Sequence, residues 1–137
     1  MAHPEYATKI IDFGFAVRSK EKLQVFCGTP AYMSPEICRK NHYDGLASDV
    51  WASGIILYSM LFGVQPFSAL TETELFRKIL KGTFKMPAIT DTNQFVGYPE
   101  IHDATAVRDL LSDILHPDET ERITAKGILY KYGPWLN

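Results

Sequence analysis

The sequence has little cysteine and almost no net charge. Its two cysteines, Cys27 and Cys38, form no metal-spaced cluster with the four histidines, so we expect neither a zinc site nor a disulfide framework. We expect both thiols to be reduced, which fits a cytoplasmic protein, with the nucleus as the alternative. A formal net charge of −2 gives no indication of binding to nucleic acid or to an anionic membrane.

Long apolar runs and a leader segment are missing as well. The longest apolar stretch, residues 50–64, is too short for a membrane span and is interrupted by Ser53 and Ser59. The first residues show no basic stretch followed by an apolar core, so no signal peptide is expected. With 46% hydrophobic and 22% charged residues, the composition is that of an ordinary globular chain.

The sequence does contain a series of helical patterns after residue 33. Ser34 followed by Pro35 is typical of a helix start, and this first helix is short, ending near residue 40. A second helix opens at residue 47 or 48 and ends at Gly63. It is apolar nearly all round, which predicts a helix at the centre of a core.

Three more helices are predicted further along the chain. Residues 71–74 form a capping-box pattern that opens the first of them. Apolar residues at i, i+3, i+4 and i+7 predict an amphipathic helix over 107–115, which Pro117 stops. A last helix starts near Thr124 and stops at Gly133-Pro134.

The remaining residues are predicted to connect these elements. Residues 8–11 favour a short strand, residues 15–32 a loop that leaves room for one further short strand, and residues 83–103 a long connection. The predicted fold class is therefore mainly α, with one short strand, a long loop and about five helices.

Four short motifs follow one another in a fixed order. Asp-Phe-Gly stands at 12–14, Gly-Thr-Pro-Ala-Tyr-Met-Ser-Pro-Glu at 28–36, Asp-Val-Trp-Ala-Ser-Gly at 49–54 and Arg-Ile-Thr at 122–124. The series resembles eukaryotic-type serine/threonine protein kinases from the magnesium-binding loop to the end of the C-lobe, and the resemblance covers the whole chain. Residues 75–82 look most like the calcium/calmodulin-dependent and AMP-activated kinase group.

The resemblance implies a partial protein kinase domain over residues 1–137. Residues 1–36 would hold the end of a strand, the Asp-Phe-Gly motif and the activation segment. Residues 37–137 would form the helical C-lobe, with the N-lobe absent. The implied activity is transfer of the γ-phosphate of ATP to Ser or Thr hydroxyls of protein substrates, with ATP and Mg²⁺ as cofactors.

The resemblance also assigns roles to single residues of the activation segment. Asp12 would hold Mg²⁺ against the ATP phosphates. Phe13 would pack to set the active or inactive arrangement, and Gly14 would let the backbone turn where a side chain could not. Thr29 would contact the catalytic loop and support catalysis, as in serine/threonine kinases. The alternatives are a turn aspartate for Asp12 and a capping or turn threonine for Thr29.

Two further assignments concern the helical part. Glu36 and Arg122 are expected to form a buried pair that ties the activation segment to the later helices, at a cost of about 3–5 kcal/mol if broken. The alternative for Arg122 is a solvated surface cation. Asp49 would anchor its helix to the backbone of the catalytic loop, or would act as an acid near the helix N-terminus, and both interpretations are open.

The chain departs from the family in two respects. The eleven residues before Asp12 contain no Gly-rich loop, strand lysine or His-Arg-Asp catalytic loop. Val25 stands where relatives carry a threonine that is phosphorylated, and valine cannot take a phosphate. We therefore expect this chain alone to be inactive. It would be part of an active kinase or, alternatively, a non-catalytic module that docks substrates or partner kinases.

The absent half has a consequence for the long helix. In the kinase fold this helix is partly covered by elements upstream of Asp12. Without them we expect one side of the helix to be exposed to solvent. We expect Trp51, Ile55, Tyr58 and Phe62 to form that open side, and Asp49 to lack its usual backbone partners. The expected partners of the chain are protein substrates and either the missing N-terminal half or a partner kinase.

Overall fold

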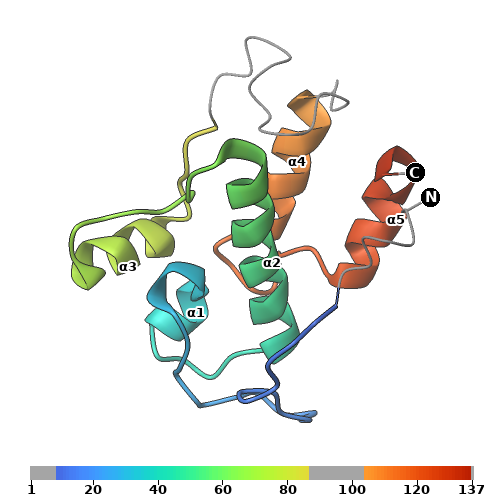
Figure 1. The fold of residues 1–137 in the computed structure, drawn as a ribbon. Coiled ribbons are helices and arrows are strands. Elements are labelled where there is room, and N and C mark those ends of the chain that lie inside the picture. Colours follow the sequence, from blue (N-terminus) through green and yellow to red (C-terminus); the bar gives the residue numbers. More distant parts are fainter. Residues whose placement is uncertain (1–8, 87–103, 137) are drawn as a thin grey trace.

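The structure, a computed structural model, describes residues 9–86 and 104–136 and is mainly helical (Figure 1). Its elements in chain order are the 3₁₀ helix η2 (Pro30–Tyr32) and the α-helices α1 (Pro35–Cys38), α2 (Gly45–Phe62), α3 (Glu72–Lys81), α4 (Ala104–Ile114) and α5 (Ala125–Leu136). The predicted mainly helical fold class is confirmed. Most of the predicted long connection, residues 87–103, lies outside the described residues.

The predicted strand is not formed in the part of the chain that the structure describes. Residues 9–11 have no regular structure, and residue 8 lies outside the described ranges. A strand needs a neighbouring strand to satisfy its backbone groups. Within the described ranges the ladder contact is a single antiparallel bridge between Leu23 and Tyr43, further along the segment.

The ends of α2 and α3 show why these helices begin and stop where they do. The side chain of Asp44 accepts a hydrogen bond from the Leu46 backbone N–H (2.8 Å), so α2 starts at Gly45 and not at residue 47 or 48 as predicted. Gly63 ends α2 in the left-handed conformation with φ 68°. The capping residue predicted for α3 is confirmed, because Thr71 accepts from the backbone N–H of the third helical residue.

The predicted start of α1 is confirmed, although without a capping hydrogen bond, and the predicted end of α5 is wrong. Ser34 is the N-cap residue of α1, but its side chain makes no capping hydrogen bond and instead pairs with the buried Ser48 hydroxyl at 3.2 Å. The helix α5 does not stop at Gly133-Pro134 but continues to Leu136. Proline removes one hydrogen bond of the helix, yet its φ is itself helical, so the chain can continue for a turn.

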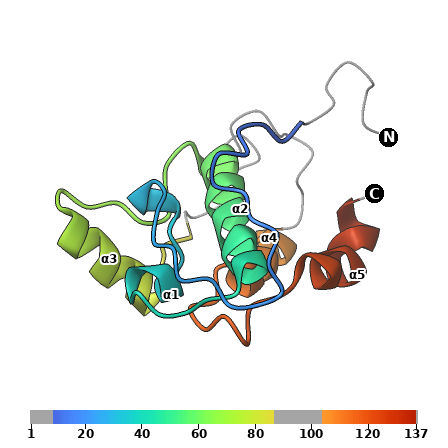
Figure 2. The same cartoon turned by 90° about the horizontal axis from the view of Figure 1, so that it is seen from below.

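The helices are arranged around α2, which stands at the centre of Figures 1 and 2. Helix α4 packs against it, α5 lies beyond α4, and α1 packs against α3 on the other side. The buried apolar residues form three neighbouring clusters, each with members from α2: Trp51, Ile55, Phe67, Ile79 and Leu115; Tyr58, Leu61, Val107 and Leu111; and Val50, Leu110, Ile114 and Tyr132. The prediction of a central core helix is therefore correct.

The side of α2 that is uncovered is not the predicted one. Trp51 and Ile55 are 0% exposed and Tyr58 is 3% exposed, and Phe62 is half-buried. Downstream residues cover this side, since the Trp51 ring stacks on the ring of Phe67 with centroids 5.7 Å apart.

The uncovered side carries three apolar residues at helical spacing, which we call the open face of α2. They are Leu46, Ile56 and Met60, which are 78%, 50% and 52% exposed. An open apolar side thus exists, but on a different part of the helix surface.

By length and composition α2 could also cross a membrane, since it has 18 residues and few charges. The expectation that residues 50–64 form no membrane span is not tested by length and composition alone, so it stays a prediction. The same composition occurs in the core helix of a soluble protein. Seven residues of α2 are buried among the neighbouring helices, so the fold itself accounts for its apolar character.

Candidate functional site

The Asp-Phe-Gly motif forms a tight turn near the start of the described chain. The Gly14 backbone N–H donates to Asp12 Oδ1 at 3.1 Å, and the Ala16 N–H donates to the Phe13 carbonyl at 3.0 Å. Asp12 has φ 61°, in the left-handed region, which aspartate tolerates better than most residues. The turn therefore orients the Asp12 carboxylate, which is exposed.

The structure changes the reason for glycine at position 14. The φ of Gly14 is not in the left-handed region. The residue of this turn with a left-handed backbone is Asp12. A Cβ on Gly14 would lie 3.2 Å from Asp12 Oδ1, within the space that the hydrogen bond uses. Phe13 is 68% exposed and belongs to none of the described core clusters, so its packing role stays a prediction.

The residues predicted for chemistry lie around one hollow. An open cavity of about 970 Å³ lies between residues 10–33 and the first turns of α2, and Asp12, Phe13, Thr29 and Asp49 all line it. These residues come from three separate motifs of the sequence. The fold therefore brings a carboxylate, a hydroxyl and a second carboxylate to the same space.

Neither Thr29 nor Asp49 has the geometry that its alternative structural role requires. Thr29 occupies the N-cap position of η2, but its side chain makes no capping hydrogen bond. Because α2 starts at Gly45, Asp49 lies beyond the first helical turn, where an acid would interact best with the helix dipole. Burial raises the pKa of Asp49, and its carboxylate has no hydrogen-bond partner within the described ranges.

The buried pair between Glu36 and Arg122 is present. Arg122 donates from Nη1 to Glu36 Oε1 at 2.8 Å and from Nη2 to Glu36 Oε2 at 2.9 Å, and both residues are 4% exposed. Arg122 also donates to the carbonyls of Ala47 (2.9 Å) and His116 (3.0 Å), and its guanidinium carbon lies 5.1 Å from the Trp51 ring centroid. All the charge is thus paired or hydrogen-bonded, as a buried ion requires.

The protonation of Glu36 follows from this pairing. Burial by itself would raise the pKa of Glu36, but the hydrogen bonds and charge of Arg122 outweigh it and hold the pKa below its ordinary value. Glu36 is therefore ionised at neutral pH. The pair joins the end of the activation segment to the loop before α5, two parts of the chain that are 86 residues apart.

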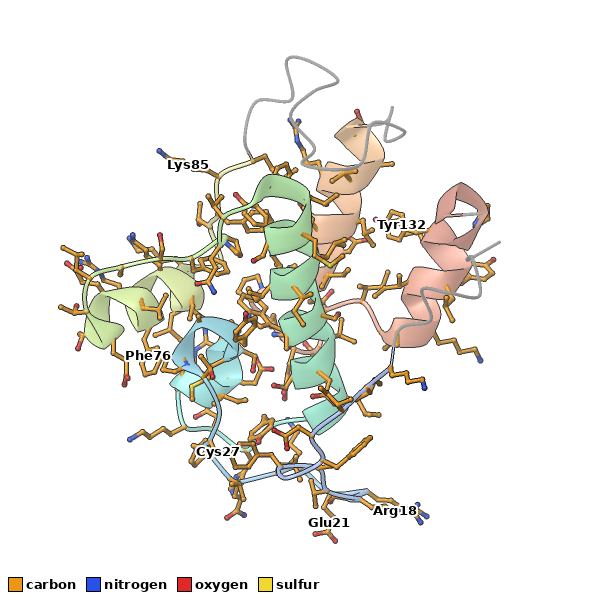
Figure 3. All side chains as sticks on the ribbon, in the orientation of Figure 1. Arg18, Glu21, Cys27, Phe76, Lys85 and Tyr132 are labelled. Carbon is orange, nitrogen blue, oxygen red and sulfur yellow. The ribbon has the colours of Figure 1, made fainter. Side chains whose placement is uncertain are left out.

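Several contacts were not predicted from the sequence. The Tyr43 hydroxyl donates to the Val25 carbonyl at 2.7 Å, and Lys22 forms an ion pair with Glu119. In α4, Asp113 accepts from the Tyr132 hydroxyl at 2.7 Å; Figure 3 shows Tyr132 pointing from α5 toward α4. No local pattern marks these residues, because their partners lie 18 to 97 positions away in the sequence.

A helical lobe with an Asp-Phe-Gly turn, a hollow beside it and a buried Glu–Arg tie is the arrangement expected for part of a protein kinase fold. The family model described as "Protein kinase domain" matches residues 1–135. The chain belongs to this family.

Curated relatives of the chain are serine/threonine protein kinases by name. It is 41% identical over 126 residues to CBL-interacting serine/threonine-protein kinase 20 of Arabidopsis thaliana, covering 88% of this chain and 26% of that protein. It is 36% identical over 133 residues to CBL-interacting protein kinase 10 of Oryza sativa subsp. japonica, covering 93% and 26%. A probable serine/threonine-protein kinase of Dictyostelium discoideum is 39% identical over 130 residues, covering 93% and 14%. The chain thus spans about a quarter or less of the length of these relatives.

Proposed function

We propose that the chain is the activation segment and C-lobe of a serine/threonine protein kinase of the calcium/calmodulin-dependent and AMP-activated group. The whole protein would transfer the γ-phosphate of ATP to Ser or Thr hydroxyls of protein substrates. The observation that supports this most is the convergence of Asp12, Thr29 and Asp49 on one hollow. The names of the relatives support the choice of Ser and Thr over Tyr.

The carboxylate of Asp12 fits the metal that protein kinases use, which is Mg²⁺ together with ATP. Mg²⁺ prefers oxygen ligands and is usually held by one or two carboxylates plus substrate phosphates. Asp12 is exposed at the hollow, and the Gly14 N–H fixes its orientation. Within residues 9–86 and 104–136 no three acidic, histidine or cysteine side chains cluster as a cage. Asp12 would therefore be one ligand among several, and bound Mg–ATP would supply the phosphate to be transferred.

Thr29 and Asp49 would act on protein groups. Both line the hollow, and neither hydroxyl nor carboxylate is engaged in a cap or an ion pair of the described chain. The Thr29 hydroxyl can donate and accept, and the Asp49 carboxylate accepts only. We propose that they hold the backbone and side chains of a catalytic loop in this hollow. The raised pKa of Asp49 marks a carboxylate that is partly desolvated before its donors arrive.

The alternative is a non-catalytic module that docks substrates or partner kinases. It is favoured by the open face of α2. In that case the chain would bind a partner with the open face, and substitutions at the hollow would leave binding unchanged.

Phosphate transfer by a longer protein tests the proposal. The assay would use a protein that carries this chain together with a Gly-rich loop and a His-Arg-Asp motif, a basic Ser/Thr peptide and Mg–ATP. Asp12→Asn should abolish turnover, and Asp109→Asn, an exposed residue of α4, serves as the matched control. The 137-residue chain alone should show no turnover. Undiminished transfer by Asp12→Asn would contradict the proposal.

A further inference from the structure

A short part of the activation segment, residues 22–26, makes several contacts with the lobe that the residues before it lack. The Leu23 N–H donates to the Tyr43 carbonyl at 2.8 Å, and the Tyr43 N–H donates to the Leu23 carbonyl at 3.1 Å. The Tyr43 hydroxyl donates to the Val25 carbonyl at 2.7 Å, and the rings of Phe26 and Tyr43 lie 6.3 Å apart. Tyr43 therefore contacts Leu23 through its backbone, Val25 through its hydroxyl and Phe26 through its ring.

Glu119 adds a second attachment at the start of this part. One carboxylate oxygen pairs with Lys22 Nζ, and the other accepts the Asp44 backbone N–H at 3.1 Å. The Glu119 side chain is 15% exposed and that of Lys22 is 58% exposed. Since Asp44 is the N-cap residue of α2, Glu119 joins the activation segment, the start of α2 and the loop before α5.

The residues upstream lack comparable support. All of residues 9–22 are exposed, and Arg18 and Glu21 extend away from the helices in Figure 3. Leu23 is the first half-buried residue, and a Cβ on Gly45 would lie only 2.9 Å from Leu23 Cδ1, so the leucine side chain lies directly against the start of α2. The ordered part of the segment thus begins where Glu119 and Tyr43 bind it.

Val25 gives these contacts a functional meaning. Activation loops of kinases are often ordered by a phosphate that pairs with cations of the lobe. Val25 has no hydroxyl to carry a phosphate, and its carbonyl is already bound by Tyr43. In this chain the two charges are exchanged. The positive charge, on Lys22, belongs to the segment, and the negative charge, on Glu119, belongs to the lobe.

We propose that Glu119 and Tyr43 are positioning residues that hold the activation segment in place without a phosphate. The proposal rests on the proposed kinase function for its biological meaning, but the contacts exist in this chain independently of catalysis. The raised pKa of Lys22, caused mainly by its hydrogen bond to Glu119, agrees with a formed pair. An exposed ion pair contributes little alone, so Tyr43 is expected to contribute more than Glu119.

Amide hydrogen exchange of the unphosphorylated 137-residue chain tests the proposal, with mass spectrometry of the peptide that contains Leu23. Tyr43→Phe should speed exchange there by about threefold to tenfold. Glu119→Gln and Lys22→Met should each speed it by about twofold to fivefold, and less at high salt because salt screens exposed charges. Peptides from α2 and α4 should exchange at the wild-type rate in all three variants, which separates local release from unfolding.

Two comparisons make the result decisive. Glu121→Gln, two residues from Glu119 and exposed, should leave the exchange of Leu23 unchanged. The double variant Lys22→Met/Glu119→Gln should exchange no faster than the faster of the single variants, because both remove the same pair. Wild-type exchange of Leu23 in both Tyr43→Phe and Glu119→Gln would overturn the proposal. This readout needs no ATP, so its failure is distinct from failure of the proposed kinase function.

Discussion

Residues 9–22 and helix α2 border the same hollow but differ completely in burial. Every residue from 9 to 22 is exposed, including the apolar Ile10, Ile11 and Phe15. Helix α2 carries seven buried residues and contributes to all three core clusters. The magnesium ligand that we propose thus lies in an exposed segment of the described residues.

This difference separates what the chain can do by itself from what needs a partner. The helices bury one another in three shared core clusters. The Asp-Phe-Gly turn is held by two local hydrogen bonds, and its apolar neighbours have no cover in the described residues. Functional groups at low local stability are common where a second element completes a site.

The largest effect is expected from breaking the buried pair between Glu36 in α1 and Arg122 in the loop before α5. Arg122→Met leaves Glu36 buried without its cation, and the free energy of unfolding should fall by about 3–5 kcal/mol. Urea unfolding measures the change, with Arg77→Met, on an exposed position of α3, as the matched control expected to change little. A loss below about 1 kcal/mol would show that the pair contributes no more than an exposed ion pair.

The same pair sets a dependence on pH. Because the pKa of Glu36 is lower in the folded chain than in the unfolded chain, its contribution is fully present above the unfolded value of about 4.3. It is lost as pH falls through the lower folded pKa. Wild type should therefore lose stability more steeply than Glu36→Gln on acidification below about pH 5.

The next effect compares the two sides of α2. A Cβ on Gly54 would lie 2.3 Å from Ile114 Cγ2, in the tight contact between α2 and α4. Gly54→Ala should cost about 1–3 kcal/mol or more, because neither helix can move away without opening the core. Gly45→Ala would meet only the end of the Leu23 side chain and should cost less. An equal loss of stability in Gly54→Ala and Gly45→Ala would contradict the difference between the side of α2 that faces α4 and the side that faces Leu23.

The open face of α2 gives an effect on association. A monomer rarely exposes a large contiguous apolar patch, so we expect this chain to self-associate or to bind a partner through Leu46, Ile56 and Met60. Ile56→Lys should raise the dissociation constant of self-association by about tenfold and change stability little. Sedimentation measures the association, with Leu129→Lys on the exposed side of α5 as control. A wild-type monomer at all concentrations would contradict this expectation.

The smallest effect is expected where α5 joins α4. Tyr132→Phe removes the hydrogen bond to Asp113 and should lower the free energy of unfolding by about 0.5–1.5 kcal/mol. Tyr130→Phe, on an 89% exposed residue of the same helix, is the control and should have no effect. Thermal unfolding of both variants measures the difference, and identical midpoints would show that this hydrogen bond is not needed.

Much of the helical part could be predicted from local signals. Thr71 and Gly63 marked helix ends correctly, since capping depends on a few neighbouring residues. The start of α2 was missed because Asp44 lies before the apolar pattern becomes visible. The Glu36–Arg122 contact was expected only through the family resemblance, since no local rule links residues so far apart.

The uncovered side of α2 could not be predicted for a physical reason. A helix that is apolar nearly all round has no amphipathic direction, so its sequence does not say which neighbours cover which side. Trp51 is covered by Phe67 downstream, whereas Ile56 is left exposed. The contacts of Lys22 and Tyr43 were missed for a similar reason, because they depend on how distant loops meet.

Amide hydrogen exchange along the whole chain tests the central contrast most directly. The account predicts that amides of α2 and α4 exchange slowest, through global unfolding, while residues 9–20 exchange at nearly the rate of an unstructured peptide. Protection should appear first at Leu23, where the backbone is bound by Tyr43. Protection of residues 9–20 equal to that of α2 would contradict the account, because the activation segment would then be as firmly folded as the core.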